Sequence, residues 1–98
     1  MSYKVVYASH ASERQFTKFA SELSQDLRDK ILNAVLDLSQ NPRPYGYTKL
    51  TPPAKVFSYV ANHRIRIKDY RVFYDVDDSH RRVIVYGIRK RDERTCRS

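Results

Sequence analysis

The sequence is poor in the residues that build cross-links and metal sites. It contains one cysteine, Cys96, in 98 residues. A single thiol excludes an internal disulfide framework and a zinc site made of several cysteines. The three histidines, His10, His63 and His80, lack the spacing of metal ligands and are expected at exposed loop or strand-end positions. We therefore expect neither a metal nor any other cofactor.

Long apolar runs and glycine-rich segments are also missing. No run approaches the ~20 apolar residues that a membrane span needs, and residues 1–7 do not resemble the core of a signal peptide. Gly46 and Gly87 are the only glycines, so the chain has no glycine-rich phosphate loop. These absences predict a cytoplasmic protein that does not contact a membrane.

Positive charge dominates what the sequence does contain. There are 19 lysines and arginines against 11 aspartates and glutamates, for a net charge of +8. The excess is concentrated in residues 62–98, which carry eleven basic and six acidic side chains. A surface of this charge attracts nucleic acid or an acidic protein and speeds association with either.

The length and the apolar pattern predict one domain over residues 1–98, with room for a single modest core. Residues 3–7 are predicted as a strand. Two amphipathic helices should follow, the first capped by Ser9 or Ser12 and the second by Ser24, before the prolines that begin at residue 42. We interpret this segment as a helical hairpin that lies on a sheet.

The rest of the chain is first rich in proline, and then its apolar and polar residues alternate. Residues 41–55 contain all four prolines and are predicted as a loop. Strands are predicted at residues 63–68, 70–76 and 82–88, where apolar and polar residues alternate. The expected fold class is α+β in the order β-α-α-β-β-β, with an antiparallel sheet covered by the helical hairpin on one face and open on the other.

The open face of this sheet is the candidate site. Alternation along a strand puts every second side chain on the same face, about 6.5 Å apart, which is close to the spacing of phosphates. An aromatic ring among such cations can stack on an unpaired base. The side chains expected on this face are Arg64, Arg66, Lys68, Arg71, Phe73, Arg89, Lys90 and Arg91.

Four segments also resemble a known family, the RelE/ParE superfamily of bacterial type II toxins, and more closely its RelE branch. The most specific segment is RIRIKDYRVFY at residues 64–74. The others are residues 3–7, residues 38–50 and residues 83–91. The element order of this family, which has a microbial ribonuclease-like fold, agrees with the order predicted above.

The resemblance implies a metal-free messenger RNA interferase, an endoribonuclease that cleaves mRNA in the ribosomal A site by attack of the ribose 2′-hydroxyl on the adjacent phosphate. It also implies a cognate acidic antitoxin protein as partner. Toxin and antitoxin are expected to form a hetero-oligomer that binds its own operator DNA through the antitoxin.

The resemblance assigns roles to individual residues. Arg71 and Arg91 would stabilise the phosphate, and Arg64 and Arg66 would position the backbone; these four are the candidate catalytic residues. Guanidinium groups suit this role because they bind phosphate with two hydrogen bonds. The candidate RNA-binding residues are Lys68, Lys90, Arg89 and Phe73.

The resemblance does not assign a general base. Arginine keeps its proton, and the position of the tyrosine in the family's C-terminal tail falls on Arg97, beside Cys96. The candidates that remain are Lys68, Lys90, Tyr70 and His63, and catalysis that depends on charge stabilisation alone is a further alternative. The segment at residues 52–62 is longer than the corresponding segment usual in the family, and it would lie beside the site.

Two other functions remain open on the sequence. One is a ParE-like toxin that inhibits DNA gyrase by binding, without nuclease activity, and the missing tail tyrosine favours it. The other is a nucleic-acid-binding module that is not toxic. Basic residues at four positions of the family motif favour the nuclease.

Overall fold

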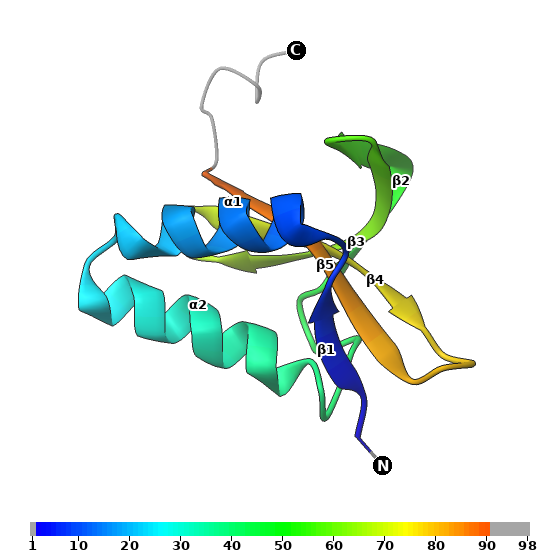
Figure 1. Cartoon of the computed structure of the whole chain (residues 1–98). Coiled ribbons are helices and arrows are strands. Elements are labelled where there is room, and N and C mark those ends of the chain that lie inside the picture. Colours follow the sequence, from blue (N-terminus) through cyan, green and yellow to red (C-terminus); the bar gives the residue numbers. More distant parts are fainter. Residues whose placement is uncertain (1, 91–98) are drawn as a thin grey trace.

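The computed structural model describes residues 2–90, which form two helices and a five-stranded mixed sheet (Figure 1). The elements in chain order are β1 (Lys4–Tyr7), α1 (His10–Ser21), α2 (Gln25–Asp37), β2 (Thr48–Val56), β3 (Tyr59–Ile67), β4 (Tyr70–Asp77) and β5 (Arg82–Lys90). The α+β fold class is confirmed. No helix in this part of the chain is long and apolar enough to cross a membrane.

The two helices begin where the sequence places their caps. The Ser9 side chain accepts a hydrogen bond from the Ser12 backbone N–H, and the Ser24 side chain accepts one from the N–H of Leu27. Each bond satisfies a backbone donor that has no partner within the helix. The helices pack side by side on one face of the sheet (Figure 1).

The sheet has the strand order β1-β5-β4-β3-β2. The pairs β2–β3, β3–β4 and β4–β5 are antiparallel, and the sequence predicts the last two of them. Strand β1 instead pairs parallel with β5, so the sheet is mixed rather than antiparallel throughout. This pairing leaves no local signal in the sequence, because residues 8–81, with two helices and three strands, separate β1 from β5.

Strand β2 corrects the predicted loop at residues 41–55. Its residues 48–56 pair with β3 although they include Pro52 and Pro53. This is physically possible because β2 is an edge strand, and the ladder with β3 is interrupted between Lys49 and Ala54, where the prolines lie.

The main core lies between the helices and the covered face of the sheet. Phe16, Ile31 and Leu38 of the helical segment are fully buried there. The sheet contributes the buried side chains of Ile65, Tyr70, Val72, Tyr74, Val83, Val85 and Ile88. Burying these side chains removes their apolar surface from water, which is the main favourable contribution to folding.

A second, smaller cluster lies at the far end of the β2–β3 hairpin. We call residues 50–61 the arm; it bends away from the rest of the sheet (Figure 1). Val56 and Ala61 of the arm are buried with Phe73 of β4. A Cβ atom added to Gly87 would lie 3.1 Å from Val56 Cγ1 and 3.1 Å from Gln15 Oε1. Glycine at this position therefore lets the arm and α1 both approach β5 closely.

Candidate nucleic-acid interface

Three arginines form a row across three neighbouring strands. Arg66 of β3 is directly opposite Arg71 of β4, and Arg71 is directly opposite Arg89 of β5. Residues that are opposite in an antiparallel pair place their side chains on the same face, and neighbouring strands are about 4.8 Å apart. The three guanidinium groups therefore start from backbone positions within roughly 10 Å of one another.

Arg64 lies beside this row, two residues before Arg66 on β3. It is opposite Phe73, and its pKa is lowered from the ordinary arginine value, first by burial and then by the positive charges of Arg71 and Arg66. The register of β3 and β4 places Arg64 on the same face as Arg66 and Arg71. We call Arg64, Arg66, Arg71 and Arg89 the arginine face.

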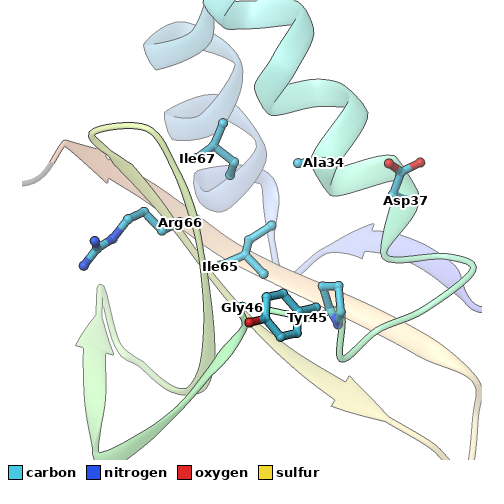
Figure 2. A pocket seen from close by; sticks show the side chains of 8 residues that line it. Ala34, Asp37, Tyr45, Gly46, Ile65, Arg66 and Ile67 are labelled. Carbon is cyan, nitrogen blue, oxygen red and sulfur yellow. The ribbon is translucent and has the colours of Figure 1, made fainter.

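A pocket lies beside β3, and the side chains that line it show which face of the sheet each one belongs to. It has a volume of about 250 Å³ and lies between α2, the loop at residues 44–46 and β3. In Figure 2, Ile65 and Ile67 point toward the helices, whereas the Arg66 guanidinium extends away from α2. This is the alternation that the sequence predicts for residues 64–67.

The guanidinium groups of the arginine face have few protein partners. Arg89 Nη2 donates a hydrogen bond of 2.8 Å to the backbone carbonyl of Lys55, and its Cζ lies 5.3 Å from the ring centroid of Phe73. Arg71 Nε is buried and has no hydrogen-bond partner in the described part of the chain. Within residues 2–90, none of the four forms a salt bridge with a carboxylate. Like charges that face each other across strands repel, so this arrangement favours an anionic ligand.

The structure separates the remaining predicted site residues. Lys68 lies in the β3–β4 turn with a φ of 55°, so the alternation of β3 ends before it. Lys90 pairs with Tyr70, whose side chain belongs to the main core, so the pairing places Lys90 on the helix side of the sheet and off the arginine face. Arg91 lies outside the described residues.

Phe73 is on the expected face but is not a free aromatic platform. Its side chain is 5% exposed, because Val56 and Ala61 of the arm pack against it and Arg89 lies over its ring. The expectation that Phe73 stacks on an unpaired base is corrected: Phe73 is a core residue under the arginine face.

A buried polar cluster was missed by the sequence interpretation. His63, expected to be exposed, is 9% exposed, and its Nδ1 lies 2.9 Å from Asp75 Oδ1. Asp75 Oδ2 accepts hydrogen bonds from Asn62 Nδ2 at 3.0 Å and from the Tyr86 hydroxyl at 3.2 Å. The signal that could have found this cluster is the strand register, which brings Asn62 and His63 beside Asp75 once β3 and β4 are paired.

Two candidate bases are therefore occupied by other contacts. His63 is held by Asp75, and its ring stacks on Tyr47 at a centroid distance of 5.8 Å. Tyr70 is almost buried and packs edge-on against Phe19 at 5.7 Å. What the described residues bring together is a set of cations for binding phosphate. They add no free acid–base pair.

The fold is that of solved RelE toxins. The chain is similar to RelE in an archaeal RelE–RelB complex from Pyrococcus horikoshii, with 22% identity, a TM-score of 0.71, and coverage of 95% of this chain and 99% of that one. It is also similar to a chain of the RelBE2 toxin–antitoxin complex from Mycobacterium tuberculosis, with 20% identity, a TM-score of 0.64, and coverage of 93% and 100%. A mutant of the E. coli RelE toxin in the free state gives 19% identity, a TM-score of 0.61, and coverage of 97% and 88%.

The family follows from a separate comparison. Residues 6–95 match the ParE toxin of the type II toxin–antitoxin system parDE. The chain therefore belongs to the ParE toxin family, within the RelE/ParE superfamily of type II toxins, and the predicted superfamily is confirmed. A search of curated proteins finds no match.

Proposed function

We propose that this toxin is a ribosome-dependent endoribonuclease that cleaves messenger RNA and so inhibits translation. The observation that carries the proposal is the arginine face, in which four guanidinium groups share one face of the sheet with no neutralising carboxylate among residues 2–90. Binding of an RNA phosphate would supply the missing negative charge.

The reaction proposed is an internal transfer at phosphorus. The ribose 2′-hydroxyl loses its proton to water, its oxygen attacks the adjacent phosphate, and the bond from phosphorus to the 5′-oxygen breaks. The products are a cyclic phosphate and a 5′-oxyanion, which becomes a hydroxyl by taking up a proton from water. Negative charge grows on the phosphate oxygens during this step, and Arg71 and Arg66 would stabilise it. Arg64 and Arg89 would hold the backbone on either side, and Arg91 keeps the phosphate role that the family resemblance implies.

Catalysis in this proposal depends on charge stabilisation more than on proton transfer. Guanidinium groups do not act as bases near neutral pH. His63 and Tyr70 are held in other contacts. Substrate geometry imposed by the ribosome would then align the 2′-oxygen with the phosphate, which by itself can lower a barrier by several kcal/mol.

An acidic antitoxin is the partner proposed for the same surface. The net charge of +8 favours association with an acidic protein. Structures similar to this chain come from RelE–RelB and RelBE2 complexes. We propose that such a partner neutralises the toxin and that the hetero-oligomer binds operator DNA through the antitoxin.

Induction of the toxin in a bacterial host tests the nuclease. Primer extension on ribosome-bound messenger RNA should show codon-phased cuts. Arg71→Ala should reduce cleavage by roughly 10²–10³-fold, as expected for loss of one transition-state charge partner. Arg14→Ala, on the exposed side of α1, is the matched control and should cleave like the parent. Equal cleavage by the Arg71 and Arg14 variants would remove the proposed site.

The second candidate is inhibition of DNA gyrase by binding. The ParE family match favours it, and so do the contacts that hold two of the candidate bases, His63 and Tyr70. Intact messenger RNA together with gyrase-linked DNA breaks after induction would select this function over the nuclease.

A further inference from the structure

The tip of the arm presents an exposed phenylalanine in an unusual backbone conformation. Val56 pairs with Tyr59, so Phe57 and Ser58 form the turn between β2 and β3. Phe57 has a φ of 56° and its side chain is 51% exposed. The left-handed region is normally occupied by glycine or asparagine, and a bulky residue there is an outlier. A buried contact does not explain a large apolar ring at this position.

The arm holds this ring next to the arginine face. Arg89 Nη2 is bonded to the Lys55 carbonyl, two residues before Phe57. Two extended residues span about 7 Å, so the tip begins close to the Arg89 end of the row. Val56, which immediately precedes Phe57, is buried against Phe73 beneath Arg89.

The other side of the arm is fixed as well. The ring of Tyr59 stacks on Tyr86 at a centroid distance of 5.1 Å and an interplanar angle of 24°. The Tyr86 hydroxyl donates to Asp75, which also binds Asn62 and His63 at the base of the arm. The ring of Phe57 is therefore presented from an anchored hairpin rather than from a loose loop.

The charge of the hairpin indicates the kind of ligand. Residues 48–67 contain Lys49, Lys55, Arg64 and Arg66 and no aspartate or glutamate. A positively charged strand pair that ends in an exposed aromatic ring matches a single-stranded nucleic acid, which combines phosphates with unpaired bases.

We infer that Phe57 is a base-stacking residue for the RNA strand whose phosphates lie on the arginine face. This inference rests on the proposed nuclease function and adds a contact that would influence which nucleotide flanks the cut. It replaces Phe73 as the aromatic component of the interface. Stacking depends on the presence of a base, whereas binding by the arginines depends on phosphates.

Two RNA probes separate the contributions of ring and charge. One is a short unstructured RNA oligonucleotide, and the other has the same length but abasic ribose throughout. Binding is measured at low salt by fluorescence anisotropy. Phe57→Gly should weaken binding of the normal oligonucleotide by roughly 5- to 150-fold and leave binding of the abasic one unchanged. Phe57→Tyr keeps an aromatic ring and should bind the normal oligonucleotide like the parent.

Glycine is chosen because it fits the backbone at this position. Phe57→Gly relieves the strain at a φ of 56°, so its urea midpoint should equal or exceed that of the parent. A loss of RNA binding without a loss of stability is not expected for a purely structural residue. Arg66→Ala should weaken binding of both oligonucleotides, because both carry phosphates.

Each unfavourable outcome has a distinct meaning. If Arg66→Ala weakens binding and Phe57→Gly does not, the stacking inference is wrong and the proposed function stands. If the parent chain binds neither oligonucleotide, both are wrong. If Phe57→Gly leaves RNA binding intact and dissociates a dimer in sedimentation, the tip is a contact between two copies of the chain and not an RNA contact.

Discussion

Arg71 occupies the middle of the arginine row, with a like charge opposite it on each side. Its Nε is buried and finds no hydrogen-bond partner among residues 2–90. A charged group in such surroundings lowers stability unless a counter-charge is present. Functional sites commonly lower the stability of the folded protein.

We therefore predict that Arg71→Met reduces cleavage of messenger RNA by roughly 10²–10³-fold and does not weaken the fold. Methionine keeps most of the aliphatic stem and removes the repulsion from Arg66 and Arg89. The free energy of unfolding in urea should stay the same or rise by up to about 1 kcal/mol. Inorganic phosphate should raise the Tm of the parent more than that of the variant. A loss above about 1 kcal/mol would show that Arg71 serves the fold, and Arg14→Met is the control.

Among individual residues, the sequence predicted which face of the sheet holds the arginines better than it predicted the burial of the rings of Phe73 and His63. Alternation alone put Arg64, Arg66 and Arg71 on one face, because a strand has a strict period of two. It placed Phe73 on that face correctly but could not show that the arm would cover it. Burial of His63 was not predictable from its neighbours, because its partner Asp75 lies on a different strand.

Strand β5 is the element that joins the two sides of the molecule. On one side the Gln15 side chain of α1 donates to the Ile88 carbonyl at 2.8 Å and accepts from the Ile88 N–H at 3.0 Å. On the other side Arg89, the next residue, is bonded to the arm. The register of the β4–β5 ladder shifts nearby, between the pairs Phe73–Gly87 and Tyr74–Val85. Gln15 satisfies both backbone groups of Ile88 close to this shift.

We predict that Gln15→Ala lowers the free energy of unfolding by about 1–3 kcal/mol, because it leaves a part-buried N–H and a carbonyl of Ile88 without partners. Chemical denaturation measures the change. Arg14→Ala, one residue earlier and exposed, should stay within about 0.5 kcal/mol of the parent. Equal stability of the two variants would mean that water replaces the glutamine at no cost.

The elements themselves were predictable to different degrees. Both helices follow from their apolar stripes and serine caps, because these are local signals. Strand β2 was missed because its prolines are typical of loops, and only its position at the edge of the sheet makes them tolerable. The parallel pairing of β1 with β5 was missed because it depends on residues at opposite ends of the chain.

On the scale of the whole molecule, one carboxylate connects three distant segments. Asp78, in the β4–β5 turn, accepts a hydrogen bond of 2.6 Å from the Tyr3 hydroxyl and one of 2.8 Å from Arg43 Nη2. These two bonds lower the pKa of Asp78 below its ordinary value. The neighbouring Asp77 also has a lowered pKa, first because of its bond to Arg82 and then because of its bond to Ser79.

These shifts predict an acid-sensitive fold. A carboxylate whose pKa is lower in the folded state stabilises the protein above its unfolded pKa of about 3.9, and the effect is lost as the pH falls through the folded value. The urea midpoint of the parent should therefore decrease as the pH falls below about 4. The decrease should be smaller in Asp78→Asn than in the parent. Asp29→Asn, on the exposed side of α2, should decline like the parent. Parallel declines in all three proteins would contradict a role for Asp78.

The parallel edge of the sheet has a consequence for the order in which the newly made protein can assemble. Strands β2 to β5 form successive hairpins, each of which can close soon after it is synthesised. Strand β1 is made first, but its partner β5 is made after all the other strands. The N-terminal segment must therefore wait, unpaired, until translation has passed residue 85, and the complete toxin cannot exist on a nascent chain shorter than that.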